Sequence, residues 1–142
     1  MDICFSNNAT NTNTQHDKLR YDKRILAKEH DQFMSTMTPE QKAIYDRIMA
    51  RVIENKPGVF FLYGYGGTGK TFLWRALSSA ICSEREIVLT VSSSGIATLL
   101  IPGGRIAHSR FGIPITIDQC STCEIHPKSH LAELIANTKL IV

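Results

Sequence analysis

Residues 64–71 have the types and spacing needed to bind a triphosphate. They read GYGGTGKT and fit the pattern G-x-x-x-x-G-K-[ST]. Glycines at Gly66, Gly67 and Gly69 let consecutive backbone N–H groups turn toward one phosphate. Lys70 can reach the β- and γ-phosphates and is the expected catalytic residue, while the Thr71 hydroxyl is a hard oxygen ligand suited to Mg²⁺. The pattern predicts a phosphate-binding loop that uses Mg²⁺ with its nucleotide.

The flanking sequence decides between this site and a glycine-rich turn that holds no ligand. The apolar run 59–63 predicts a short strand buried on both faces. Residues 71–82 carry apolar side chains at helical spacing, so a helix should follow the loop and direct its N-terminus at the same anion. A strand before the loop and a helix after it favour the phosphate-binding interpretation.

Further elements are expected on both sides of this loop. Thr38 followed by Pro39 and Gln41 predicts a helix start with a capping box, and 55–58 should end that helix. Strands are predicted at 87–91 and 140–142, and short helices at 96–101 and around 131–135. This alternation predicts an α/β fold built on a parallel sheet with flanking helices.

Composition limits the class of protein. The chain has 142 residues, 43% hydrophobic and 20% charged, with a formal charge of +3, which is typical of one soluble domain. We expect a disordered Asn/Thr-rich tail over 1–17, a charged arm with a possible helix over 18–36, and the folded P-loop region over 37–142. The sequence shows no secretory signal and no apolar run that could cross a membrane. The four cysteines are therefore expected to be reduced thiols of an intracellular protein.

Three blocks of sequence around and beyond the loop resemble a known family. The blocks 37–49, 60–77 and 91–115 together resemble the Pif-type DNA helicases of superfamily 1, most closely their plant, helitron-related branch. The resemblance covers about residues 19–142. It implies a RecA-like P-loop NTPase fold and an ATP-dependent DNA helicase that moves 5′-to-3′ on single-stranded DNA. It also implies roles in repair, recombination and telomere maintenance, and residence in the nucleus.

The resemblance assigns the ATP contacts residue by residue. Besides Gly64, Tyr65, Gly66, Gly67, Thr68, Gly69, Lys70 and Thr71, it places Gln41 where a family glutamine contacts adenine through its amide. The alternative for Gln41 is a capping-box side chain that bonds only the helix start. Both roles suit the same position, and only the resemblance favours adenine.

The resemblance also implies a path for single-stranded DNA. The block 92–97, with Ser93, Ser94 and Gly95, offers hydroxyls and backbone N–H groups at a helix start, although it also suits a plain polar loop. A second block supplies His108, Ser109 and Phe111. Phe111 could stack on a base or pack in the core, and His108 could contact DNA or serve as a structural histidine. Ile106 departs from the family pattern, where a small hydroxyl residue is expected.

The stretch Cys120-x-x-Cys123-x-x-His126-x-x-x-His130 contains four residues of the types that bind zinc. Its two-residue gap between Cys123 and His126 is too short for paired zinc knuckles, so no zinc is expected.

The acidic residues that ATP hydrolysis needs are less evident in the sequence. In the family an Asp-Glu pair follows an apolar strand, and here that strand matches 138–142, where the sequence stops. Asp118 is a weak substitute, since Pro114 and loop-like residues surround it. We therefore expect the N-terminal portion of an incomplete first motor domain, almost inactive alone and poorly soluble because its sheet edge is open. The alternatives are a non-catalytic ATP-binding fragment or pseudogene product, and a small-molecule kinase, which would need an arginine-rich lid that the sequence lacks.

Overall fold

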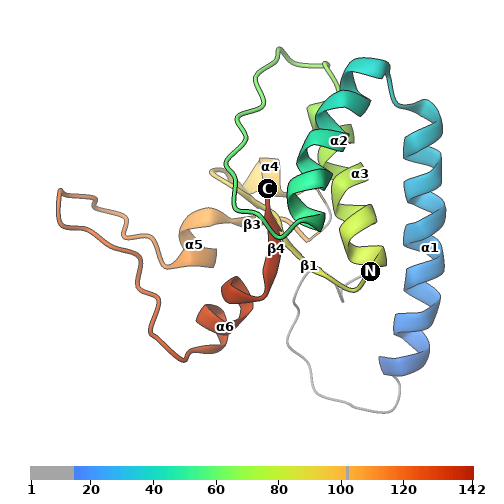
Figure 1. The fold of residues 1–142 in the computed structure, drawn as a ribbon. Coiled ribbons are helices and arrows are strands. Elements are labelled where there is room, and N and C mark those ends of the chain that lie inside the picture. The colour runs from blue at the N-terminus through green and yellow to red at the C-terminus, as the bar shows by residue number, and fades with distance from the viewer. Residues whose placement is uncertain (1–14, 102) are drawn as a thin grey trace.

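The computed structural model describes residues 15–101 and 103–142, and for 15–24 it gives the helical backbone alone. Three helices stand side by side: α1 (Gln15–Thr36), α2 (Pro39–Ile53) and α3 (Lys70–Ser83). A small group of parallel strands lies against them, with three short helices, α4 (Gly95–Thr98), α5 (Ala107–Phe111) and α6 (His130–Ala136), around its edge (Figure 1). The α/β prediction with parallel strands is confirmed in this general form.

The predicted start of α2 is confirmed. Thr38 is its N-cap, and both hydrogen bonds of the capping box to Gln41 are present. Tyr45 and Ile48 are buried on the face that packs against α3. The helix ends at Ile53, and Asn55 then takes a left-handed φ of 50°, so the chain turns where the sequence predicted.

The strands form one parallel arrangement. β1 (Ile87–Leu89) pairs with β4 (Thr138–Ile141), and β2 (Val91–Ser92) pairs with β3 (Arg105–Ile106). The Thr90 carbonyl accepts from Arg105 N–H on one side, while Val91 N–H donates to the Val142 carbonyl on the other. Neighbouring residues of a strand direct their backbone groups to opposite edges, so β3 and β4 flank a central strand made of β1 and β2. The strand predictions at 87–91 and 140–142 are confirmed to within two residues.

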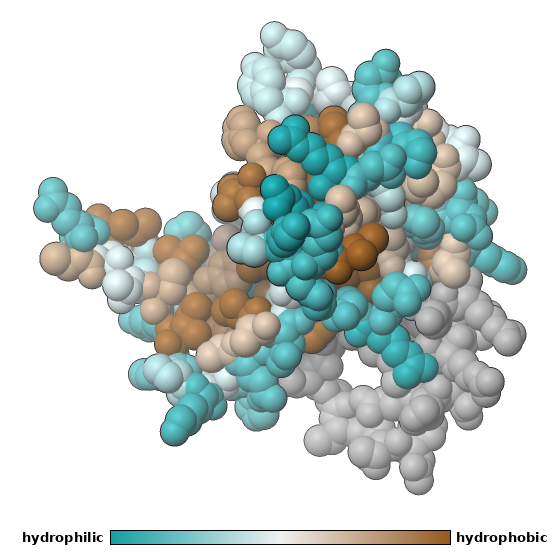
Figure 2. Space-filling view, viewed as in Figure 1, coloured by the Kyte–Doolittle hydropathy of each residue, from teal (hydrophilic) through white to brown (hydrophobic). Residues whose placement is uncertain are grey.

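The strand predicted at 59–63 is wrong. These residues are in no strand, and the Phe61 side chain is 90% exposed. A strand forms only where a neighbouring backbone can complete its ladder. Here the described strands pair among themselves, and a groove separates β4 from residues 57–60. Figure 2 shows hydrophobic surface along this segment, which follows α2 in Figure 1.

The core lies between the helices and β1. Leu73, Ala76 and Leu77 of α3 and Val88 of β1 are almost completely inaccessible to solvent. α3 is therefore the central element of the molecule, and its buried face holds the loop at its N-terminus in place.

Helix α1 covers another side of α3. Phe33 meets Phe72 edge-on at 5.2 Å between ring centroids, and Arg75 lies over the Phe33 ring at 5.8 Å. A hydrogen bond of 2.8 Å between His30 Nε2 and the Tyr45 hydroxyl connects α1 to α2. Burial raises the pKa of the Tyr45 hydroxyl. The arm expected over 18–36 is helical and begins earlier, at Gln15. Residues 1–14 of the expected tail lie outside the described residues.

Candidate nucleotide and nucleic-acid site

The loop between residues 63 and 70 has the backbone that its glycines allow. Gly67 and Gly69 both have φ of 80°, and Gly69 is the N-cap of α3 without any side-chain cap. A Cβ at Gly64 would lie 2.8 Å from Thr68 Oγ1, and one at Gly69 would lie 2.3 Å from Gln41 Nε2. A larger residue at either position would therefore force the Thr68 or the Gln41 side chain to move. The N-terminal N–H groups of α3 have no side-chain acceptor, which is the arrangement that binds phosphate.

Lys70 turns its ammonium back over the loop. Its Nζ donates to the Gly64 carbonyl at 2.6 Å and to the Tyr65 carbonyl at 2.8 Å, with Thr68 Oγ1 at 3.5 Å. Thr68 itself bonds to the Tyr65 carbonyl through its hydroxyl at 2.9 Å. A positive charge therefore lies directly beside the loop, where a phosphate group would need it.

Gln41 makes contacts at both ends of its amide. Its Oε1 accepts from the Thr38 N–H at 3.1 Å, which completes the capping box. Its Nε2 donates to the Thr68 carbonyl at 3.5 Å. Both capping-box bonds are present, but the interpretation in which Gln41 bonds only the helix start is wrong, because the same side chain also reaches the phosphate-binding loop. A contact with adenine stays a prediction.

Thr71 is the residue whose chemistry fits a magnesium ion held with a nucleotide. It lies in the first turn of α3, half-buried and directly after Lys70. A threonine hydroxyl is a hard oxygen donor, and Mg²⁺ takes its other ligands from phosphate oxygens, water and a carboxylate. Among the residues that the structure describes, no group of three or more His, Cys, Asp or Glu side chains could hold a metal.

Asp118, the weak candidate for that carboxylate, is held by hydrogen bonds within its own turn. It accepts from the Ser121 hydroxyl at 2.8 Å and from the Cys120 N–H at 2.9 Å, and these bonds lower the pKa of its carboxyl. It lies in the long connection between α5 and α6, which extends away from the helices (Figure 1). Cys120 and Cys123 of the same connection are exposed free thiols.

The structure brings the two predicted DNA-contact blocks together. β2 and β3 run parallel with Ser92 opposite Ile106, so the residues that follow each strand emerge at the same edge of the sheet. Ser93, Ser94 and Gly95 follow β2, and α5 with His108 and Ser109 follows β3. Ser93, Ser94, Gly95, His108 and Ser109 are all exposed, whereas Ser92 is partly buried.

The Ser94 side chain caps the N-terminus of α4. Its hydroxyl accepts from Ala97 N–H at 3.3 Å as the N-cap of α4, and the Ser92 hydroxyl donates to the Ser94 carbonyl at 2.7 Å. These bonds fix the shape of the polar loop. Phe111 is half-buried at the end of α5, so both interpretations of its ring remain open.

Two arginines at this edge were missed by sequence reasoning. Arg105 belongs to β3, and Arg110 lies in α5 close enough that burial and then the Arg105 charge lower its pKa. An arginine remains protonated despite such a shift, so both carry charge at neutral pH. Their spacing of five residues gave no helical or strand signal, and only the direct passage of β3 into α5 brings them close.

The sequence profile of the PIF1-like helicase family matches residues 36–142. The chain is also similar to the ATP-dependent DNA helicase PIF4 of Trypanosoma brucei brucei, at 28% identity over 100 residues. That match covers 68% of this chain and 12% of the trypanosome protein, so the chain corresponds to a small part of that relative's length. No helix among the described residues is long and apolar enough to span a membrane.

Proposed function

This chain belongs to the PIF1-like helicase family, and we propose from that premise that its loop 64–71 binds ATP as part of an ATP-dependent DNA helicase. The observation that carries the proposal is the position of Lys70, whose ammonium lies over the glycine-rich loop at the N-terminus of α3. A triphosphate in that loop would meet a cation, backbone N–H groups and the positive end of a helix dipole.

The site residues have separate roles in this proposal. Lys70 neutralises the β- and γ-phosphates, Thr71 supplies a hydroxyl ligand for Mg²⁺, and Gly64 to Gly69 form the cradle. We also propose that the Gln41 amide contacts adenine; its bond to the Thr68 carbonyl places it beside the loop and supports this. Bound Mg²⁺ would offset the negative charge that develops on the transferred phosphate.

Residues 1–142 alone are proposed to bind ATP with little turnover. Hydrolysis in this class of reaction needs a carboxylate for the metal and a group that positions the attacking water. Asp118, the candidate named from sequence, is engaged in its own turn. We propose that in the active helicase this RecA-like first motor domain works together with a second motor domain.

Single-stranded DNA is the proposed nucleic-acid partner. Ser93, Ser94 and Gly95 would bind the backbone, with His108, Ser109 and Phe111 further along the same sheet edge. The resemblance to Pif-type helicases supports 5′-to-3′ movement, roles in repair, recombination and telomere maintenance, and a nuclear location as further proposals.

An equilibrium titration tests the ATP site directly. We expect the purified chain to bind a fluorescent ATP analogue saturably in the presence of Mg²⁺, and unlabelled ATP to displace it. In the same samples, phosphate release should stay near background with or without single-stranded oligonucleotide. Rapid DNA-stimulated release would contradict the proposed lack of turnover, and an absence of saturable binding would contradict the ATP site itself.

The DNA surface is tested through Arg110. We propose that the Arg110 guanidinium adds one phosphate contact at this edge, so replacing Arg110 with glutamine should weaken binding of a labelled oligo(dT) about 3- to 10-fold at low salt. The slope of log affinity against log salt should become shallower by about 0.7, the value for one contact on a single strand. Arg47→Gln on the exposed side of α2 is the matched control and should change neither quantity. An unchanged slope in Arg110→Gln would place the DNA elsewhere.

A further inference from the structure

The long connection between α5 and α6 carries two exposed thiols. Cys120 and Cys123 are three positions apart, and both are exposed and outside any disulfide. The connection extends away from the helices (Figure 1), so small molecules in solution can reach both sulfurs. Cys82, by contrast, is buried in α3 with only 4% of its surface exposed. Two accessible thiols at this spacing have the arrangement of dithiols that exchange with disulfides.

A compact turn holds Cys120 in place. The Cys120 N–H donates to Asp118 Oδ1 at 2.9 Å, and the Ser121 hydroxyl donates to the same oxygen at 2.8 Å. The Asp118 N–H donates to Ser121 Oγ at 2.8 Å, and the Ser121 N–H donates to the Asp118 carbonyl at 3.3 Å. Four hydrogen bonds therefore fix the backbone on the N-terminal side of the pair.

The residue after Cys123 contacts the end of α5. The Glu124 N–H donates to the Gly112 carbonyl at 2.9 Å, and Gly112 is the C-cap of α5 with a left-handed φ of 59°. A Cβ on Gly112 would lie 3.2 Å from the Glu124 carbonyl oxygen, so the two backbones are in close contact. Helix α5 contains His108 and Ser109, which are proposed to contact DNA. A movement of Cys123 would therefore be felt at this helix.

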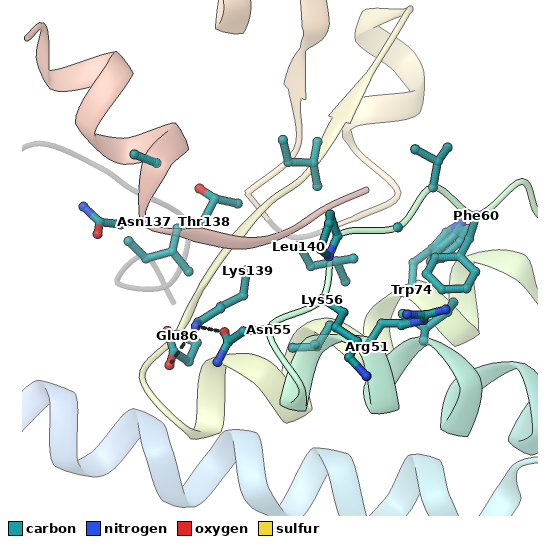
Figure 3. A pocket seen from close by; sticks show the side chains of 18 of the residues that line it. Arg51, Asn55, Lys56, Phe60, Trp74, Glu86, Asn137, Thr138, Lys139 and Leu140 are labelled. Atoms are coloured by element: carbon teal, nitrogen blue, oxygen red, sulfur yellow. Dashed lines mark hydrogen bonds and ion pairs between the residues drawn. The ribbon is translucent and has the colours of Figure 1, made fainter.

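The far end of the connection is fixed by separate contacts. Ser129 Oγ accepts from the Ala132 N–H at 3.1 Å and caps α6. Strand β4 follows, where Lys139 Nζ lies 3.9 Å from Glu86 Oε1 and donates to Asn55 Oδ1 (Figure 3). A rearrangement between the two cysteines should therefore stay within the connection and at the end of α5.

We propose that Cys120 and Cys123 form a reversible redox site that is oxidised by a low-molecular-weight disulfide such as oxidised glutathione. The thiolate of one cysteine attacks a glutathione sulfur, which forms a mixed disulfide and releases one reduced glutathione. The second thiolate attacks the protein sulfur of that mixed disulfide, which forms the Cys120–Cys123 bond and releases the second glutathione. The dithiol loses two electrons and two protons, and the glutathione disulfide gains them.

Closure of this bond changes the backbone next to α5. A disulfide needs its two Cα atoms within about 4.4–6.8 Å of each other. Residues 121–126 form no turn or bend, so the chain must bend between the two cysteines. Cys120 is held by a turn of four hydrogen bonds, whereas one backbone bond joins Glu124 to Gly112. We therefore expect the Glu124–Gly112 bond to break when the disulfide forms. The inference does not depend on whether the loop 64–71 binds ATP or the sheet edge binds DNA.

Mass spectrometry of the full chain tests the site. All samples carry Cys4→Ser, because Cys4 lies outside the described residues. After incubation with excess oxidised glutathione and quenching with iodoacetamide, most molecules should be lighter by two hydrogen atoms and unalkylated at Cys120 and Cys123. Dithiothreitol should restore both thiols.

Two single variants show whether the two cysteines react with each other. Cys120→Ser and Cys123→Ser should each stop at the mixed disulfide, with one glutathione attached to the remaining cysteine. Persistence of both thiols in excess oxidised glutathione would overturn the proposal. Covalent dimers of the chain as the main product would overturn it as well.

Hydrogen exchange measured by NMR tests the coupling to α5. In the oxidised chain the Glu124 amide should exchange about 3- to 10-fold faster than in the reduced chain. The Asn137 amide, which donates to the Glu133 carbonyl at 3.1 Å in α6, is the internal control and should not change. In Asp118→Ala the turn is released, so the disulfide should form while the Glu124 amide stays protected. An unchanged Glu124 rate in the oxidised parent chain, or the same acceleration in Asp118→Ala, would overturn the coupling.

Discussion

Replacement of Lys70 by alanine is expected to reduce ATP affinity by at least about 100-fold. The side chain donates charge-assisted hydrogen bonds, each worth about 1.5–3 kcal/mol, and a triphosphate would use it at two phosphates. Since about 1.4 kcal/mol corresponds to tenfold in affinity, the loss of both contacts exceeds a factor of 100. The titration with a fluorescent ATP analogue measures this change.

The structure also shows what else the Lys70 substitution removes. The bonds from Nζ to the Gly64 and Tyr65 carbonyls disappear, so the loop loses an internal connection. Thermal unfolding of the variant distinguishes a loosened protein from a lost ligand contact. Lys42→Ala is the matched control, because Lys42 is exposed and pairs with Asp46 at 3.3 Å on α2. Equal ATP affinity in Lys70→Ala and the parent chain would show that the loop is not the site.

Substitution of Gly69 by alanine should have the second-largest effect. Its φ of 80° is unfavourable for any residue with a Cβ, and strain of this kind costs about 1–3 kcal/mol. In addition, the new methyl group would lie 2.3 Å from Gln41 Nε2. Gln41 would have to move away, which would disturb the bond that its Oε1 accepts from the Thr38 N–H, and a hydrogen bond of this kind contributes about 0.5–1.5 kcal/mol. We expect lower stability and weaker ATP binding together.

Other glycines of the same loop separate these contributions. Gly67 has the same φ but nothing within 4 Å of an added Cβ, so Gly67→Ala should show the strain alone. Gly66 has open space and no positive φ, so Gly66→Ala should be neutral or stabilising by about 0.4–1 kcal/mol in urea unfolding. The double variant Gln41→Ala/Gly69→Ala should recover the steric part. Equal free energies of unfolding for all three single variants would refute this account of the loop.

Local signals in the sequence predicted the parts of the site that depend on neighbouring residues. The capping box at Thr38 and Gln41 and the helix after Lys70 involve groups only a few positions apart. Their types and spacing therefore suffice to specify the structure. The roles of these residues toward ATP and DNA stay predictions, because they depend on ligands as well as on the fold.

Pairing between distant segments could not be predicted in the same way. The run 59–63 has strand-forming residues, but whether it becomes a strand depends on an edge contributed from elsewhere. β3 contains only Arg105 and Ile106, too few residues for any periodicity. Its pairing with β2 nevertheless brings the two predicted DNA blocks together and places Arg110 beside them.

Helix α1 shows that evolutionary and folding boundaries differ in this protein. The family match begins at residue 36, where α1 ends, yet Phe33 of α1 packs on Phe72 and His30 bonds to Tyr45. A chain shortened to the matched residues would lack the contacts of α1 with α3, the helix that carries the phosphate-binding loop. A folded fragment that binds nucleotide should therefore include α1 as well as the residues that match the family.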